Sequence, residues 1–480
     1  MSDTGVTVKK TEDFSEWYTQ VVLKSRLADY APIKGCMIFR EDSYAIWEKI
    51  QEIFNRKIKS TGHRNVYFPL FIPESFLEKE AEHFAGFVPE VAWVTQGGES
   101  PLEEKLAIRP TSETVMYATY AKWIRSWRDL PVKLNQWCSV VRWETKATKL
   151  LLRTREFLWQ EGHTAHATRT EADEEAIEIL NAYRNVMDAY LAVPVLAGKK
   201  TEMEKFAGAL YTLTLEAMMP DGKALQMGTS HNLGQNFSKV FGIKFLDQNE
   251  KEQNVWQTSW GFSTRTIGAV IMLHGDDKGL VIPPKVAPTQ VVIVPIPYKR
   301  ADAEKITTKA GEVHERLQKE GTAVVLDNRP EYTPGWKFNE WELKGIPVRI
   351  EIGPKDVKLN QVTLFRRDCL TKTAVRDEQI EVAVRALLEE IQCNLFDKAK
   401  RLLEDNITTV NNYTEFKETL QKKGGFIRAC WCLDSGCEEK IKNETAATIR
   451  TVPLKKEEPF SDCVCCGKQA KEVVYFARSY

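Results

Sequence analysis

The sequence predicts a protein of mixed α and β structure in three domains, and three observations support this prediction. In the first half, segments with helical spacing of apolar residues alternate with segments rich in β-forming residues. A Pro-rich stretch, 283–288, is then followed by alternating strand and helix patterns. Finally, cysteines cluster between Cys430 and Cys466. We therefore expect domains over residues 1–284, 285–404 and 405–480.

The first domain is expected to contain both long helices and neighbouring strands. Ile46, Ile50 and Phe54 recur at helical spacing, whereas the segments around Trp137 and Trp159 are rich in β-formers. A second amphipathic pattern, from Ile177 to Leu191, belongs to the core. The expected elements are a helix at 43–60, a strand at 66–69, strands at 132–144 and 153–166 joined by a basic loop at 145–149, and a helix at 171–192.

The second domain is expected to be a small α/β unit with a largely parallel sheet, because its strand and helix patterns alternate regularly. The expected elements are strands at 291–294, 323–326 and 348–352 and helices at 301–320, 337–343 and about 376–404.

Composition limits the classes of function. The chain of 480 residues has 43% apolar and 28% charged residues, as in ordinary globular proteins. The first twenty residues contain acids and no apolar segment, and no run of about 18 apolar residues occurs, so we expect neither a signal peptide nor a membrane span. A cytoplasmic location follows as an expectation. The net charge is zero, so any nucleic-acid surface must be local.

The sequence lacks the two commonest glycine-rich phosphate loops, so side chains must bind any nucleotide. Arginine suits this task because its planar fork gives two charge-assisted hydrogen bonds to a phosphate or carboxylate. A single arginine on a strand is usually just solvated. The candidates form a group, however: Arg142, Glu144, Arg153, Arg155 and Arg265.

These residues resemble the signature motifs of class II aminoacyl-tRNA synthetases. Arg142-Trp143-Glu144, a variable loop and Arg153 resemble the second motif; Arg265, before an apolar helix, resembles the third; residues 65–73 around Pro69 resemble the first. The resemblance implies an α+β catalytic domain with an antiparallel sheet, ATP bound in a bent form, and a homodimer formed through the first motif.

Three further stretches resemble the prolyl-tRNA synthetase family: residues 109–113 (RPTSE), 159–163 (WQEGH) and 228–234 (GTSHNLG). The resemblance implies that L-proline, ATP with Mg²⁺, and tRNA(Pro) are bound, and that Arg142 and Arg265 are catalytic. The implied proline-binding residues are Thr111, Glu113, Arg142, Trp159, Glu161, His163, Phe206 and His231. The implied ATP-binding residues are Arg142, Glu144, Arg153, Thr154, Gln226, Thr229, Ser263 and Arg265.

Some of these residues have simpler interpretations. Glu113 can stabilise the start of a helix near Ser112, since acids are favoured in a first helical turn. Trp159 can be a core residue. His163 and His166 suggest a metal pair, but residues three apart on a strand point to opposite faces.

The second domain resembles the anticodon-binding domain of several class II synthetases. Seven Lys or Arg stand against three acids from Arg349 to Arg376, although such a surplus is usually a solvated face. The resemblance assigns Glu342, Arg349 and Lys355 to anticodon guanines, whose edges suit carboxylate and guanidinium partners.

The third domain is expected to be a small α+β unit with structural zinc. Cys432 and Cys437 form one short-spaced pair and Cys463 and Cys466 another, and no histidine follows His314. Two such pairs suit a tetrahedral all-sulfur Zn²⁺ site. Cys465 remains an alternative to Cys466. By the resemblance, a C-terminal tyrosine such as Tyr480 can fold back toward the catalytic domain.

One departure and two alternatives remain. Only about a hundred residues separate the second and third motifs, too few for the editing insertion of many bacterial prolyl enzymes. This fits the archaeal and eukaryotic-like form. The alternatives are another class II synthetase, such as the threonyl or seryl type, and a non-catalytic tRNA-binding paralogue. The threonyl type requires a catalytic zinc with Cys and His ligands, and paralogues usually lose the motif arginines, which are present here.

Overall fold

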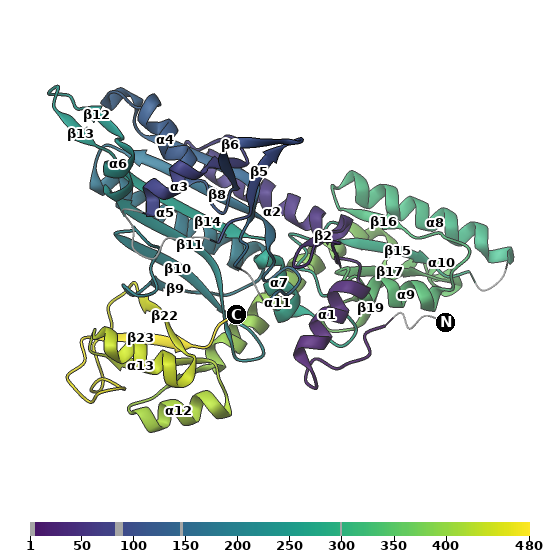
Figure 1. The fold of residues 1–480 in the computed structure, drawn as a ribbon. Helices are drawn as coiled ribbons and strands as arrows, with labels where there is room; N and C mark the ends of the chain where they lie inside the picture. Colours follow the sequence, from purple (N-terminus) through teal and green to yellow (C-terminus); the bar gives the residue numbers. More distant parts are fainter. Residues whose placement is uncertain (1–4, 82–89, 145–146, 298–299) are drawn as a thin grey trace.

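The computed structural model describes residues 5–81, 90–144, 147–297 and 300–480 and forms three lobes (Figure 1). An eleven-stranded sheet runs through two of them, in the order β20-β21-β23-β22-β9-β10-β11-β14-β8-β7-β3. Its strands are β3 (Arg64–Asn65), β7 (Val132–Val141), β8 (Glu156–His166), β9 (Leu196–Lys199), β10 (Tyr211–Met218), β11 (Ala224–Gly234), β14 (Trp256–Ser263), β20 (Ile407–Thr409), β21 (Phe426–Trp431), β22 (Thr448–Pro453) and β23 (Glu472–Ala477).

The catalytic part of this sheet, from β9 to β7, is antiparallel throughout, which confirms the sheet type that the resemblance implied. Smaller sheets and several helices complete this lobe. They are β1 (Ala28–Tyr30) with β2 (Met37–Phe39), β4 (Phe71–Pro73) with β6 (Ser100–Ile108) and β5 (Trp93–Gly97), β12 (Lys244–Leu246) with β13 (Glu252–Asn254), and α1 (Phe14–Lys24), α2 (Glu41–Lys59), α3 (Glu74–Ala81), α4 (Glu113–Trp123), α5 (Arg169–Asn185), α6 (Asn236–Phe241) and α7 (Arg265–His274).

Alternation along the strands gives the sheet two different faces. On β14, Trp260 and Phe262 pack against Phe54 of α2 and Tyr183 of α5 in the main core. Side chains at the intervening positions point to the other face. Gly162 of β8 is required by this packing, because a Cβ atom there would lie 2.0 Å from the ring of Trp260. One face is thus core, and the other is free to form a site.

Several expected boundaries were wrong. Residues 66–69 are not a strand: β3 ends at Asn65, and the side chain of Gln136 then accepts a hydrogen bond from the backbone of Phe68 in place of a strand partner. Strands β7 and β8 are shorter than expected, since the connection turns back on itself through a Lys149–Arg153 bridge. Arg142 and Arg153 of the second motif therefore lie in this connection. Its residues 145–146 lie outside the described ranges.

The expected helix at 171–192 is α5 followed by a π-helical turn, Val186–Tyr190. A capping box fixes its start: Thr168 accepts from the backbone of Glu171, whose carboxylate accepts from the backbone of Thr168. Most of the expected stripe is buried, but Ile177 is 49% exposed and lies outside the buried face of α5.

The second lobe contains a mixed five-stranded sheet in the order β16-β15-β17-β18-β19. Strand β15 is parallel to both neighbours, whereas β18 and β19 are antiparallel additions that the sequence reading missed, so the sheet is only partly parallel. The left-handed residue Asn360 turns the chain into β18. The elements are β15 (Val291–Pro295), α8 (Arg300–Lys319), β16 (Val324–Leu326), α9 (Pro334–Leu343), β17 (Val348–Ile352), α10 (Pro354–Leu359), β18 (Gln361–Arg366), β19 (Lys372–Arg376) and α11 (Ile380–Asp405).

The third lobe adds α12 (Tyr413–Lys422) and α13 (Ser435–Thr445) to strands β20 to β23. Its strand β22 pairs with β9, so the catalytic sheet continues into this lobe. Buried charges reinforce the junction: Glu216 of β10 accepts from Lys200 at 2.8 Å and from Arg450 of β22 at 3.0 Å. Among the described residues, no helix combines the length and apolar character needed to cross a membrane.

Candidate active site

The face of the antiparallel sheet opposite the main core carries a cavity of about 410 Å³, lined by β8, β11 and β14 and by the starts of α4 and α7. A second cavity of about 260 Å³ adjoins it. The two share lining residues, among them Arg142, Glu144, Ser263 and Arg265, so they form one continuous site with two ends.

The site brings together the residues that the sequence indicated, except Arg155, which lines neither cavity. The first cavity is lined by Thr111, Glu113, Arg142, Glu144, Trp159, Glu161, His163, Phe206, Gln226, Thr229, His231, Ser263 and Arg265. The second adds Arg153 and Thr154, and Tyr480 also lines it. The C-terminal tyrosine therefore folds back onto the catalytic lobe, where its hydroxyl donates to Asp221 at 2.6 Å.

Glu161 is a buried carboxylate whose partners are built into the fold. Its oxygens accept from Ser112 and Gln136, and one lies 3.2 Å from Nε2 of His163. Burial alone would raise the pKa of Glu161, but the hydrogen bonds and charge of His163 together with these donors hold it below its usual range. In turn, Glu161 and Glu113 raise the pKa of His163 despite burial. The pair behaves as an ion pair at the pocket wall.

We expect Glu161→Gln to lower the pKa of His163, because the substitution removes the hydrogen-bonded anion that stabilises the imidazolium. An NMR titration of the histidine ring protons measures this change directly. His231 is the internal reference, since burial lowers its pKa to about 3 and it stays neutral near pH 7. An unchanged pKa of His163 would show that the two groups are not coupled.

Glu113 is the first residue of α4, and its side chain accepts a hydrogen bond from the hydroxyl of Thr111. It makes the charge interaction with the helix start that the simpler interpretation expected, yet it also lines the cavity. Ligand atoms of Glu113, Glu161 and His163 lie within 4.8 Å of one another, close enough for a metal. The oxygens of Glu161 are already occupied by protein donors, which disfavours that use.

Trp159 and the histidines also have defined places. The indole of Trp159 lies only partly buried at the cavity and donates to Sγ of Cys138 at 3.3 Å, so it is not a simple core residue. His231 bonds to Thr212 and Thr229, and its ring lies 4.8 Å from that of Phe206. His166 instead lies 2.8 Å from Oγ1 of Thr164 and does not line either cavity.

The two arginines at the junction of the cavities are held by backbone carbonyls. Arg142 donates weakly to Pro110 and lies 5.4 Å from the rings of both Phe157 and Trp159. Arg265 donates to the carbonyls of Leu152 and Gln226 at 3.2 and 3.5 Å. Burial and the charge of Arg142 lower the pKa of Arg265 to about 10, so its guanidinium group is cationic near pH 7; burial also lowers the pKa of Arg142. Such an arrangement suits a phosphate between them.

The proposed anticodon residues lie in the second lobe and differ in exposure. Glu342 lines a cavity of about 390 Å³ between α9 and the end of α1. Arg349 is 4% exposed, lies 4.0 Å from the rings of both Phe338 and Phe365, and donates to Glu342 at 2.9 Å. Lys355 is exposed at the start of α10. In this structure Arg349 orients Glu342, which is itself 8% exposed, and only Lys355 is exposed among the three.

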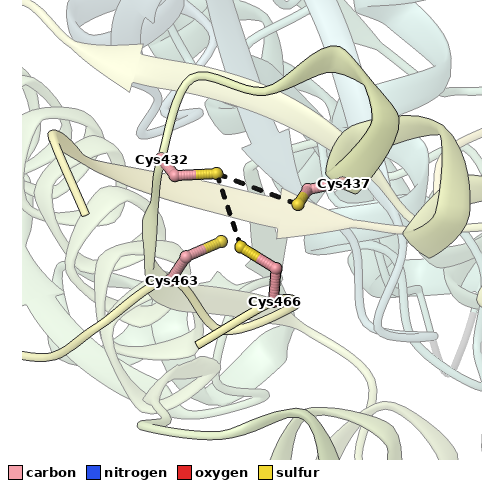
Figure 2. Close-up of side chains that lie close together, drawn as sticks. All are labelled: Cys432, Cys437, Cys463 and Cys466. Carbon is pink, nitrogen blue, oxygen red and sulfur yellow. Dashed lines mark hydrogen bonds between the residues drawn. The ribbon is translucent and has the colours of Figure 1, made fainter. Parts of the chain in front are cut away.

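Four cysteines of the third lobe converge, as Figure 2 shows: Cys432, Cys437, Cys463 and Cys466. Sγ of Cys432 lies 3.8 Å from those of Cys437 and Cys466. A tetrahedron with Zn–S bonds of about 2.3 Å has sulfur atoms about 3.8 Å apart, so the set fits a closed zinc site. Cys465 is not part of the cluster.

Comparisons with known proteins agree with this arrangement. Residues 94–274 match the family described as tRNA synthetase class II core domain (G, H, P, S and T), and residues 290–394 match the anticodon binding domain. Residues 413–480 match the prolyl-tRNA synthetase C-terminal family. A proline–tRNA ligase from Natranaerobius thermophilus is 54% identical over 473 residues, covering 98% of this chain and 97% of that protein. The chain belongs to the prolyl-tRNA synthetase family.

Other members of the prolyl-tRNA synthetase family extend the comparison. Proline–tRNA ligase 2 from Clostridioides difficile is 54% identical, covering 98% of this chain and 97% of that protein. The crystal structure of prolyl-tRNA synthetase from Cryptosporidium parvum, complexed with halofuginone and AMPPNP, superposes with a TM-score of 0.96 at 47% identity, and both chains are fully covered. The chain is thus a class II ligase, and the threonyl and seryl alternatives are excluded. Since these matches cover nearly all of both chains, the relatives lack a large inserted domain as well.

The sequence reading missed part of this prolyl-tRNA synthetase site. Lys200, Glu204 and Lys205, which follow β9, line the first cavity, as does Ser259 of β14. No phosphate motif marks the lysines, and only the pairing of β9 with β10 brings them to the cavity. Ser259 could have been found from alternation, because it lies two residues from Gly261 and four from Ser263 on the same strand.

Proposed function

We propose that this chain activates L-proline with ATP in the cytoplasm and transfers the prolyl group to the 3′ end of tRNA(Pro). The observation that supports this most strongly is the continuous site in which a buried anionic pocket at Glu113 and Glu161 meets two cationic side chains, Arg142 and Arg265. An amino acid carries an ammonium group for the anionic pocket and a carboxylate for the arginines. The phosphates of ATP are the second anionic partner of the arginines.

In this proposal Thr111 and Glu113 together hold the secondary ammonium of proline. A buried carboxylate is costly alone, but it becomes a specific recognition element opposite a cation. The ring then lies among Trp159, Phe206 and His231, with the Glu161–His163 pair fixing the wall. The neutral His231 adds no charge that would repel the ammonium.

The chemical step needs no general base, because the proline carboxylate is already an anion. One carboxylate oxygen attacks the α-phosphorus of ATP, an O–P bond forms, the bond to the β-phosphate oxygen breaks, and pyrophosphate leaves. Arg142 and Arg265 stabilise the charge that develops on the phosphoryl oxygens, so catalysis is positioning plus electrostatics. A hydroxyl of the 3′-terminal adenosine of tRNA then attacks the prolyl carbonyl and loses its proton, an ester bond forms, the anhydride bond to the phosphate breaks, and AMP leaves.

ATP lies across the two cavities in this proposal, contacted by Glu144, Arg153, Thr154, Gln226, Thr229 and Ser263. Glu144 is an exposed carboxylate at both cavities, and Mg²⁺ takes one or two carboxylates together with substrate phosphates. When bound, Mg²⁺ would screen the phosphate charge.

Glu113→Gln is expected to raise the KM for proline about 100-fold, because it removes the buried anion that pairs with the ammonium. The KM for ATP should change little, since Glu113 lies at the other end of the site. Pyrophosphate exchange measured at varied proline and at varied ATP separates the two effects. Equal changes in both constants would argue against a specific role in proline binding.

We also assign the anticodon guanines to Glu342, Arg349 and Lys355. Because Glu342 and Arg349 are both buried, their side chains must rearrange to reach a base. The four-cysteine cluster holds Zn²⁺; with no open position the ion is structural. Domain boundaries lie near residues 284 and 404.

A homodimer through the first motif is supported by the apolar side chains that this region exposes. Tyr67 is 71% exposed and Phe71 is 44% exposed, beside the edge strand β3. Exposed aromatic groups beside an unpaired edge are typical of an interface.

Charging of tRNA(Pro) with radiolabelled proline tests the whole proposal. We expect acid-precipitable label that depends on ATP and on the guanines of the anticodon. Binding of tRNA without charging, by folded protein, would favour the non-catalytic paralogue instead.

A further inference from the structure

The turn of residues 275–279 joins the proposed catalytic and anticodon sites. It directly follows α7, whose first residue is Arg265. On its other side it touches the end of α9, where Glu342 lies. A helix of ten residues is about 15 Å long, so the turn and Arg265 lie at opposite ends of one short helix.

A buried arginine fastens this turn to the second lobe. Arg367, which is 1% exposed, donates to the two carboxylate oxygens of Asp276 at 2.6 and 2.5 Å. Its Nε donates to the backbone carbonyl of Glu342 at 2.9 Å. Because the planar guanidinium binds both Asp276 and Glu342, it fixes the distance and the relative orientation of the turn and the end of α9. The carboxylate of the turn and the backbone of Glu342 therefore move together.

Further contacts make this junction close-fitting. Lys278 of the turn donates to the carboxylate of Glu342 at 2.9 Å, and the backbone of Leu280 donates to Leu343 at 3.0 Å. Gly279 has a φ of +129°, and a Cβ atom there would lie 2.6 Å from the carbonyl oxygen of Leu343. The turn and the end of α9 thus meet backbone to backbone.

Helix α7 and its junction with the turn are packed equally tightly in the catalytic lobe. Helix α7 is almost wholly buried in the main core, with Ile267, Val270 and Ile271 at most 1% exposed. Trp17 and Lys10 of the catalytic lobe hold the carbonyls of Asp276 and Gly275 at 3.0 and 2.7 Å. A buried helix packed on all sides shifts as one body rather than bending. Displacement of the turn must therefore reach Arg265.

We propose that Arg367 and Asp276 are positioning residues that couple the occupied anticodon site to the placement of Arg265. The proposal rests on the proposed reading of a guanine by Glu342. A base that hydrogen-bonds to the carboxylate of Glu342 competes with Lys278 for this group and repositions the end of α9. The Arg367–Asp276 pair then transmits this shift to the turn and to α7. The correct anticodon then raises the turnover rate as well as affinity.

The test compares kcat for charging at saturating tRNA, using tRNA(Pro) and the same tRNA with its anticodon guanines replaced by cytidine. The variants are Asp276→Asn and Arg367→Lys, each of which breaks the two-pronged contact. Arg366→Lys is the matched control, because the neighbouring Arg366 contacts Asp368 and Glu390 within its own lobe. Pyrophosphate exchange without tRNA, and the KM for tRNA(Pro), are measured in parallel.

We expect the wild-type protein and Arg366→Lys to charge tRNA(Pro) with a clearly higher kcat than the altered tRNA. In Asp276→Asn and Arg367→Lys this kcat ratio should fall at least about five-fold, the lower end of typical coupling between sites. Exchange without tRNA and the KM for tRNA(Pro) should stay within about two-fold of wild type.

Three results would overturn the coupling. The first is a wild-type kcat that is the same for both tRNAs, and the second is a kcat ratio that stays unchanged in both variants. The third is an equal loss of tRNA-independent exchange, which would show that the pair only supports the active site. If Arg367→Lys fails to fold, Asp276→Asn still decides, because it leaves Arg367 unchanged. Failure of the wild-type protein to charge any tRNA would instead refute the proposed function.

Discussion

Arg142→Ala is expected to reduce proline-dependent ATP–pyrophosphate exchange by about 10³-fold, at the upper end of what one stabilising donor contributes to kcat. The reason is that Arg142 lines both cavities, and in the proposed function it contacts the proline carboxylate and the α-phosphate together. Arg142→Lys should recover little activity, since an ammonium keeps the charge but lacks the planar fork. Binding of tRNA, measured by filter retention, should stay near the wild-type value.

Arg155→Lys is the matched control for this prediction. Arg155 lies in the same connection between β7 and β8, but it stacks on Trp143 at 4.3 Å and lines neither cavity. We expect it to keep exchange activity. If Arg142→Ala lost exchange and tRNA binding equally, the substitution would have disturbed the fold and the assigned role would be unsupported.

Cys437→Ser is expected to abolish zinc binding and to unfold the third lobe. Structural zinc contributes an apparent free energy of about 10–16 kcal/mol in small zinc domains, more than such a lobe can lose. The damage should extend to the catalytic sheet, because β22 pairs with β9 and Arg450 neutralises the buried Glu216. Metal analysis by inductively coupled plasma spectrometry and thermal unfolding would show a lost ion and a lower Tm.

Cys465→Ser separates the zinc ligands from their neighbours. Cys465 adjoins Cys466 in the chain but lies outside the cluster, so this variant should keep one zinc ion per chain and a normal Tm. Cys466→Ser should behave like Cys437→Ser. The opposite pattern for Cys465 and Cys466 would show that the cluster is assembled differently when metal is bound.

Much of the site could be predicted because its residues lie in short contiguous motifs. Arg142, Glu144 and Arg153 surround one turn, and Glu161 and His163 alternate on one strand, so local spacing places them on one face. The cysteine pairs were recognisable for the same reason. Spacing alone left Cys465 as an alternative ligand to Cys466, because adjacent cysteines can reach the same metal site. The structure places only Cys466 in the cluster.

The missed features depend on contacts distant in sequence. Lys200 lines the cavity only because β9 pairs with β10, and Asp276 meets Arg367 across 91 residues. Strands β18 and β19 were overlooked because the turn between them, residues 367–371 with the left-handed Leu370, has no proline or glycine to mark it. Arg349 was assigned from the family resemblance, and its burial between Phe338 and Phe365 could not be predicted from sequence.

ATP–pyrophosphate exchange with each of the twenty amino acids in turn is the most direct test of the central claim, because it measures activation without tRNA. The site predicts exchange that depends on proline and is lost in Arg142→Ala. Exchange with a different amino acid would contradict the assigned pocket, and no exchange by folded, zinc-loaded protein would contradict the assigned activity.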